Sequence, residues 1–170
     1  SRCNGWYLFF HMALDLAESR GIVSFLTSNY WLTARGAYKL RKRIYKETSI
    51  LQYVDFKDNR VFEGAKGVHT NLLVVRKQIE KNTQVKCILY DKKVPKSSDL
   101  IEIMPEQETF RINQSHITLD GWDTYFHFLP VNFLSVLKTI TASAQTLKES
   151  TYYVKEGLIR NGYLNKDEDN

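Results

Sequence analysis

The sequence predicts an α/β fold, and three observations support this. Residues 21–76 alternate short apolar runs with one helical pattern, in the order strand, helix, strand, loop, strand. The chain of 170 residues is 43% apolar, which is normal for a domain with a sizeable core. Polar and aromatic residues follow directly at the end of the first apolar run, at positions 27–31. Because ligands gather outside the carboxyl ends of strands in open α/β sheets, a functional site is expected there.

The first helix and the first strand of this stretch are short and apolar. Residues 6–20 carry apolar side chains at helical spacing, and Gly21 is expected to end that helix. The run 22–27 is too short for a helix and is expected to form a strand that is buried on both faces.

A second helix and two further strands complete the stretch. The helix is expected over 34–47, with its basic residues on the outer faces. Its inner face is expected to consist of Ala37, Tyr38, Leu40 and Ile44. Strands are expected over 50–56 and 70–76, joined by a polar, glycine-rich loop at 57–68. Because only a loop separates these two strands, they are expected to be antiparallel.

The remaining residues predict a mixed α+β segment. An edge strand is expected at 85–90, a short helix near 99–103 and an extended piece at 110–117. A longer helix is expected over 132–148, where apolar residues recur at helical spacing.

Composition and motif spacing argue against several classes of protein. No apolar run approaches the roughly 20 residues that a membrane-spanning helix needs. Cys3 and Cys87 lie far apart, which argues against a disulfide framework or a CxxC metal site and favours a reducing, cytoplasmic setting. The four histidines lack metal-ligand spacing, so no metal is expected. Neither GxSxG nor a phosphate-binding glycine loop occurs, so the sequence predicts no hydrolytic triad and no nucleotide anchor.

Basic residues are concentrated on the predicted helix 34–47. The net charge is +5, and six lysines and arginines fall within residues 35–46. Arg35, Lys39 and Arg43 are candidates for contacts with DNA phosphates. The alternative interpretation is a solvated basic face without a nucleic-acid partner.

Aromatic residues near the ends of the strands are the stronger candidates for ligand contact. Asn29, Tyr30 and Trp31 are candidates for pocket lining, and the alternative is that the two aromatics cover the edge of the sheet. Phe62 lies in the polar loop 57–68. An enzyme that acts on a base removes it from the stack and holds it against an aromatic ring. This stacking stabilises the complex by about 1 to 3 kcal/mol per base. A loop aromatic suits that role, and anchoring the loop on the core is the alternative.

Several motifs in residues 4–77 occur in an order that resembles a known family. The motifs are Tyr7-Leu8-Phe9-Phe10, the run 21–32 followed by Lys39-Leu40-Arg41, Val54-Asp55-Phe56, Val61-Phe62-Glu63 and the run 70–75. In this order and spacing the chain resembles the C-terminal half of adenine-N6 DNA methyltransferases. The most similar type is the TaqI-like group, which includes the large single-chain type IIG restriction-modification enzymes.

The resemblance implies the late strands of a Rossmann-like methyltransferase sheet. The run 22–27 would be its fifth strand, 50–56 its sixth, and 69–76 an antiparallel seventh strand inserted between them. The resemblance also implies that Phe62 is the loop aromatic that stacks on the flipped adenine.

The resemblance further implies that the chemistry lies outside this chain. The family's catalytic motif, an Asn or Asp followed by Pro-Pro and an aromatic, has no counterpart here, and neither has its glycine-rich motif for S-adenosylmethionine. Both are expected upstream of Ser1, so the catalytic residues are unknown and the isolated chain is expected to be inactive. The expected partners are DNA and the rest of the parent polypeptide.

The second half of the chain resembles the lead-in to the family's specificity region. The resemblance rests on residues 110–115 with Gly121-Trp122, and on residues 154–162. It divides the chain into 1–90, the C-terminal part of a methyltransferase domain, and 91–170, a linker and the start of a target-recognition region. Two alternatives remain open. One is a noncatalytic DNA-binding module, which the charge of +5 and the 13% aromatic content favour; the other is a methyltransferase that acts on RNA or protein.

Overall fold

The computed structural model describes residues 5–62, 68–91, 93–94, 99–118 and 125–143. Of these, the residues up to Leu134 belong to one compact unit and residues 135–143 belong to a second. The sequence motifs at Gly121-Trp122 and at 154–162 lie outside the described residues.

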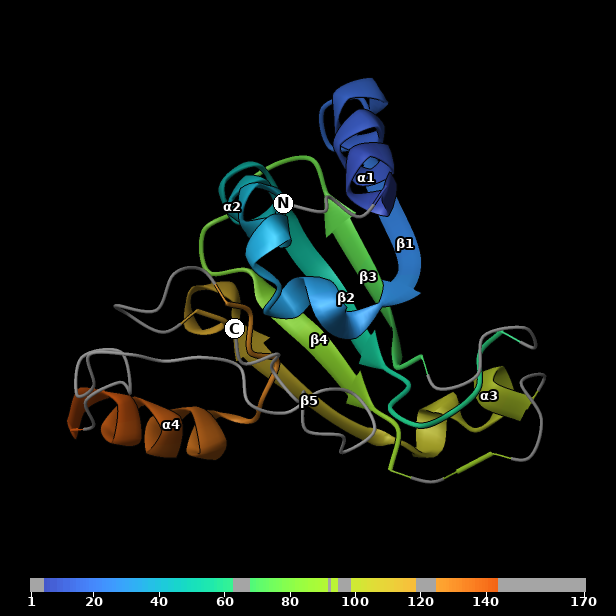
Figure 1. The fold of residues 1–170 in the computed structure, drawn as a ribbon, viewed down its shortest axis with the longest axis vertical. Helices are drawn as coiled ribbons and strands as arrows, with labels where there is room; N and C mark the ends of the chain where they lie inside the picture. The colour runs from blue at the N-terminus through green and yellow to red at the C-terminus, as the bar shows by residue number, and fades with distance from the viewer. Residues whose placement is uncertain (1–4, 63–67, 92, 95–98, 119–124, 144–170) are drawn as a thin grey trace, which may run out of the picture. The chain divides into compact units, whose positions relative to one another are not determined.

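A mixed five-stranded sheet forms the centre of the first unit (Figure 1). In sequence order its strands are β1 (Ile22–Ser28), β2 (Ser49–Asp55), β3 (Thr70–Arg76), β4 (Gln84–Leu89) and β5 (Glu108–Asn113). Their order in the sheet is β1-β3-β2-β4-β5. Strand β3 lies between β1 and β2 and is antiparallel to both, which confirms the expected antiparallel strand inserted between its neighbours.

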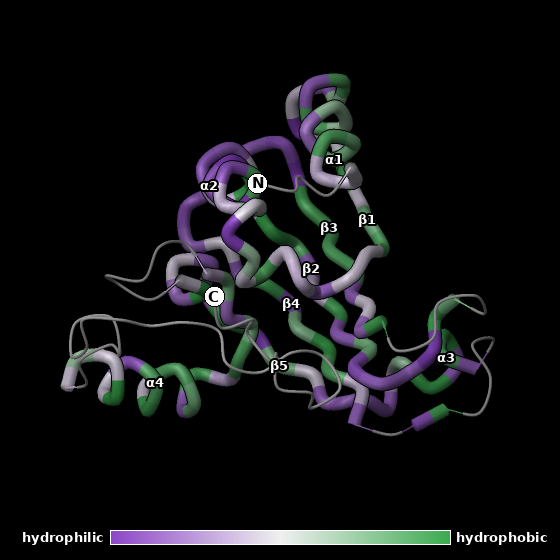
Figure 2. The backbone as a smooth tube through the Cα atoms, in the orientation of Figure 1, coloured by the Kyte–Doolittle hydropathy of each residue, from purple (hydrophilic) through white to green (hydrophobic). Residues whose placement is uncertain are grey.

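Two helices pack on one face of the sheet. Helix α1 (Gly5–Leu16) precedes β1, and α2 (Tyr38–Glu47) connects β1 to β2. Buried side chains from both helices share one hydrophobic core with β1, β2, β3 and β4. In Figure 2 the central strands are largely hydrophobic, whereas α2 is mostly hydrophilic because only one of its faces enters the core.

The inner faces of both helices follow the predicted periodicity. In α1 the buried residues are Tyr7, Phe10 and Leu14. In α2 they include Leu40 and Ile44, but Tyr38 is 38% exposed, so its predicted place on the inner face is wrong. Helix α1 ends before Gly21, where an added Cβ would lie 2.9 Å from the carbonyl oxygen of Glu18, so the turn into β1 requires glycine.

Three further predictions, about burial and strand position, are wrong. Strand β1 is not buried on both faces: Ile22 is 53% exposed and Leu26 is 39% exposed, because β1 is an edge strand whose second face is uncovered among the described residues. Strand β4 is not an edge strand, because β5 pairs with it antiparallel on the side away from β2. Arg41 does not lie on an outer face of α2; it is buried.

Short elements connect and follow the sheet. After β1 the chain forms two 3-10 turns, η1 (Asn29–Leu32) and η2 (Arg35–Ala37). Helix α3 (Asp99–Glu102) confirms the short helix expected near 99–103, and β5 is followed by η4 (Gln114–His116). Helix α4 (Val131–Ser143) overlaps the helix expected over 132–148, and residues 144–148 fall outside the described ones. None of the helices in the described part is long and apolar enough to cross a membrane.

Candidate functional site

One end of the sheet brings together the carboxyl ends of β1 and β2 and the start of β3. Asn71 on β3 pairs with Thr27 on β1 and with Asp55 on β2. The backbone N–H of Asn29 donates to the carbonyl oxygen of His69 at 3.0 Å, which joins the turn after β1 to the segment that leads into β3. The polar strand ends predicted from the sequence are therefore brought together at the carboxyl edge of β1 and β2.

The three candidates for pocket lining in η1 have different surroundings. Trp31 is 0% exposed and its ring lies edge-on to the rings of Trp6 and Phe126, at centroid distances of 6.2 Å and 5.6 Å. Its indole Nε1 donates to Asn71 Oδ1 at 3.4 Å. Tyr30 is 53% exposed, and Asn29 is half-buried. Trp31 is therefore a core residue, and Tyr30 is the aromatic of this turn that is open to a ligand.

The side chain of Arg41 stabilises the turn after β1 by hydrogen bonds to its backbone. Its guanidinium donates to the carbonyl oxygens of Trp31 and Ala34, the second at 2.8 Å, and lies over the ring of Tyr125 with 5.4 Å to the centroid. Burial lowers the pKa of Arg41 from its ordinary value of 12.5. The sequence contained a signal for this position, because Arg41 lies four residues after the buried Ala37 and so on the same face of the helix.

The loop between β2 and β3 presents one apolar residue to the core and the next to solvent. Val61 packs against the second hydrophobic core, formed by Val54, Phe56, Ile88, Tyr90 and Leu100. Phe62 is 45% exposed. Residues 63–67 of this loop lie outside the described part of the chain. Val61 is thus the residue that anchors the loop, which leaves Phe62 available for contact with a ligand.

The base of the same loop carries two polar residues that the sequence prediction did not single out. Asn59 is buried, and its Oδ1 accepts a hydrogen bond from the backbone N–H of Val94 at 2.7 Å. Asp58 Oδ1 lies 3.4 Å from His69 Nδ1, although both side chains are largely exposed.

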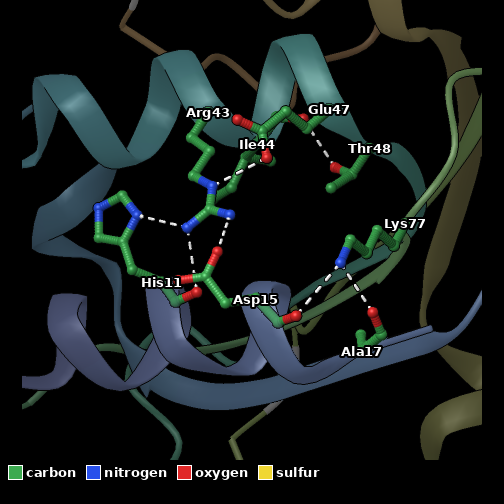
Figure 3. A network of polar contacts seen from close by, with 8 residues as sticks. All are labelled: His11, Asp15, Ala17, Arg43, Ile44, Glu47, Thr48 and Lys77. Atoms are coloured by element: carbon green, nitrogen blue, oxygen red, sulfur yellow. Dashed lines mark hydrogen bonds and ion pairs between the residues drawn. The ribbon is translucent and has the colours of Figure 1, made fainter. Parts of the chain in front are cut away.

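The basic residues of η2 and α2 lie in three different environments. Within α2, Arg41 is buried, Lys39 is exposed and Arg43 is bound to neighbouring groups, and Arg35 in the preceding η2 is exposed. Figure 3 shows the Arg43 guanidinium between the two helices, where it pairs with Asp15 and Glu47.

The Arg43 network joins α2 to α1. Arg43 Nε lies 2.8 Å from Glu47 Oε2, and another guanidinium nitrogen donates to the carbonyl oxygen of His11 at 3.0 Å. The hydrogen bond from Arg43 lowers the pKa of Asp15, and the same bond raises the pKa of Arg43. Lys77 donates to the carbonyl oxygen of Ala17 at 2.7 Å, which fastens the end of the same α1 segment to the residue after β3.

Cysteine and metal chemistry have no support at this edge. Cys87 is buried in β4, and burial raises the pKa of its thiol to about 12, which makes it a poor nucleophile. Among the residues that the structure describes, no three side chains of His, Cys, Asp or Glu are grouped so that they could hold a metal ion.

The comparison with protein families finds one match. Residues 2–62 match the profile of the Eco57I restriction-modification methylase family. The comparison with curated proteins gives no match.

Solved structures with a similar fold come from restriction-modification enzymes. A modification subunit of a type I restriction enzyme from Vibrio vulnificus YJ016 is 15% identical, with a TM-score of 0.58 over 78% of this chain and 33% of the other. The M protein of the type I restriction enzyme EcoKI is 11% identical, with a TM-score of 0.55 over 84% of this chain and 45% of the other. The type ISP enzyme LlaGI, as a nuclease-deletion mutant in complex with a DNA substrate mimic, is 14% identical, with a TM-score of 0.53 over 76% of this chain and 12% of the other.

The chain therefore spans less than half the length of each of these proteins. At these identities the structural likeness establishes the fold, which is that of a partial Rossmann-like methyltransferase sheet. The resemblance to restriction-modification methyltransferases is confirmed: residues 2–62 match the Eco57I restriction-modification methylase family model, and the fold is shared with subunits of restriction-modification enzymes.

Proposed function

We propose that this chain is part of a DNA methyltransferase that transfers a methyl group from S-adenosylmethionine to the N6 of adenine within a restriction-modification system. The observation that carries the proposal is the loop between β2 and β3, in which Val61 packs on the core and Phe62 is exposed. The match of residues 2–62 to a restriction-modification methylase family supports it.

The exposed ring of Phe62 suits the recognition of an extrahelical base. A base that leaves the duplex loses its stacking partners, and an aromatic side chain restores about 1 to 3 kcal/mol of that interaction. The turn after β1 adds Tyr30 and Asn29, whose backbone is bonded to the segment that leads into β3. We propose that Phe62 stacks on the adenine and that these two residues line the pocket.

The groups that perform the transfer belong to another part of the intact protein. The residues present do not fit a donor site, because the chain has no glycine-rich strand-turn for S-adenosylmethionine and no Asn/Asp-Pro-Pro-aromatic motif. We therefore assign neither a methyl-donor residue nor a catalytic residue here, and we expect the isolated chain to be inactive.

An uncovered apolar surface supports the view that more of the sheet exists in the intact protein. The outer side of α1 exposes four large apolar residues, and the second face of β1 exposes two more. They are Leu8, Phe9, Met12, Leu16, Ile22 and Leu26. A helix that is apolar all round is normally buried, and an apolar edge strand normally pairs. We propose that other parts of the methyltransferase fold in the intact protein cover these two surfaces.

The basic helix provides two candidates for contacts with the DNA backbone. Arg35 and Lys39 are exposed, and we propose that they lie near DNA phosphates. Arg43 is held by Asp15 and Glu47, and we assign it to the junction between α1 and α2. The proposed partners are thus DNA and the rest of the parent polypeptide, and we expect the protein to act in the cytoplasm, where its substrate lies.

The test uses the intact protein that contains this chain. Transfer of labelled methyl groups from S-adenosylmethionine is measured on duplex DNA, RNA and protein, and the product nucleoside is identified by mass spectrometry. We expect N6-methyladenine in DNA. Phe62→Ala should reduce turnover far more than Phe62→Trp, because tryptophan retains a stacking face. Equal losses in the two variants would remove the stacking role.

The noncatalytic alternative predicts a different result. A DNA-binding module would show a salt-dependent affinity for DNA that S-adenosylmethionine does not change, and no methyl transfer. Methylation of RNA or protein in place of DNA would likewise overturn the proposal.

A further inference from the structure

The chain leaves β2 through a tight turn before it reaches Phe62. The backbone N–H of Asn59 donates to the carbonyl oxygen of Phe56 at 2.9 Å, and the backbone N–H of Lys57 donates to Asp55 Oδ1 at 2.8 Å. Lys57 has a φ of 47°, in the left-handed region that side-chain-bearing residues rarely adopt. These hydrogen bonds fix the backbone conformation of the first four residues after β2.

Asn59 connects this turn to the chain that follows β4. Its side chain is 4% exposed, and its Oδ1 accepts from the backbone N–H of Val94 at 2.7 Å. Two further contacts join the same segments: the N–H of Tyr90 donates to the carbonyl oxygen of Asp55 at 2.9 Å, and Val61 and Val94 pack against the same core. The next residue, Arg60, donates from Nε to the carbonyl oxygen of Phe62 at 3.4 Å, and Asn59 is the buried polar residue that ties this stretch to the segment after β4.

We propose that Asn59 is a positioning residue for Phe62. The inference rests on the proposed function, because it assigns Asn59 a role only through the base that Phe62 contacts. Asn59 lies three residues before Phe62 and fixes the base of the loop, and Val61 then directs the next side chain outward. A stacked ring and a base must lie within a few tenths of an ångström of van der Waals contact, and a misplacement of about 1 Å can reduce turnover on the order of 100-fold.

The test combines Asn59 and Phe62 in a double-mutant cycle in the intact methyltransferase. Asn59→Leu keeps the approximate size of the side chain and removes the acceptor for the N–H of Val94. If Asn59 acts through Phe62, Asn59→Leu lowers kcat about 10-fold in the protein that has Phe62. In the Phe62→Ala background it lowers kcat less than about 2-fold, since a loop without the ring has nothing to position. Asn59→Asp retains the Oδ1 acceptor but places a carboxylate in a buried position, so it is expected to keep more activity than Asn59→Leu without reaching that of the wild type.

Asn113 offers a matched control at the other end of the sheet. Its Oδ1 accepts from the backbone N–H of Ser115 at 2.9 Å, and it pairs with Gln84 at the first residue of β4. Asn113→Leu removes a similar bond far from the carboxyl edge, and it should change kcat by the same factor with or without the Phe62 ring. Circular dichroism checks that each variant folds. Asn59→Ala, which adds no bulk, replaces the leucine variant if that one does not fold.

The outcomes separate this inference from the proposed function. A wild-type protein that transfers no methyl group removes both. An active wild type that is sensitive to Phe62→Ala, with an effect of Asn59→Leu that is equal in the two backgrounds, overturns the role of Asn59 alone. The role of Asn59 is established if Asn59→Leu lowers kcat in the protein with Phe62 but not in Phe62→Ala, and if Asn59→Asp retains more activity than Asn59→Leu.

Discussion

The buried pair of Trp31 and Asn71 provides a quantitative test of how the turn after β1 is held. Trp31 Nε1 donates to Asn71 Oδ1 at 3.4 Å, and both side chains are buried. The indole is a donor only, so the amide oxygen of Asn71 must face it. The amide nitrogen then points away, and it has no hydrogen-bond partner among the described residues.

The expected free energies follow from which polar groups each substitution leaves without a partner. Trp31→Phe keeps an aromatic ring but strands the whole amide of Asn71, and the unfolding free energy should fall by about 2 kcal/mol. Asn71→Leu strands the indole N–H but also removes the unpaired amide nitrogen, so the loss should be about 1 kcal/mol. In the double variant no polar group of this pair remains without a partner, but the smaller ring at position 31 and the leucine at position 71 still disturb the core packing. We therefore expect a loss of about 2 kcal/mol instead of the sum, about 3 kcal/mol.

Urea unfolding followed by far-UV circular dichroism measures the four free energies of this cycle. A coupling of about 1 kcal/mol lies well above the scatter of about 0.3 to 0.5 kcal/mol that independent sites show. Trp31→Phe combined with Asn113→Leu is the control, because these residues lie apart and their effects should add. If the Trp31 and Asn71 variants also add within that scatter, the bond contributes nothing to stability and the reasoning fails.

Three further predictions concern the thiol, the histidines and the apolar surface. Because burial raises the pKa of Cys87 to about 12, iodoacetamide should modify this thiol only as fast as the protein unfolds, and rapid labelling of the native state, detected by peptide mass spectrometry, would contradict its burial. Burial lowers the pKa of both His11 and His127 from 6.5, so the unfolded state binds more protons than the folded state. The unfolding free energy should be at its full value above that pH and decrease as pH falls below it. Gln at either position should reduce the slope of the unfolding free energy against pH, measured by urea unfolding, and an unchanged slope would argue against these shifts. Lysine in place of the exposed residues Met12 and Leu16 should reduce self-association in light scattering without lowering Tm, whereas a loss of folding would show that these positions are not exposed.

Local patterns explain why part of the fold was accessible from the sequence. The period of apolar residues identified α1 and α2, and the short polar loop between two apolar runs identified β2 and β3 as antiparallel, because neither inference needs contacts between distant residues. The inserted position of β3 came from a family resemblance, since periodicity alone does not order strands in a sheet. The stacking role of Phe62 stays a prediction.

The sequence by itself therefore determined the order and type of the main elements, and the tertiary structure decided which side chains they bury. Arg41 was expected on a solvated face, yet it is buried because the turn after β1 places two carbonyl oxygens above it. Trp31 lies in the core because Trp6 and Phe126 approach it from opposite ends of the chain. Burial depends on long-range packing, which no local spacing encodes. For the same reason Asn59, an ordinary loop residue in the sequence, became the link between two loops only when Val94, 35 residues later, was brought beside it.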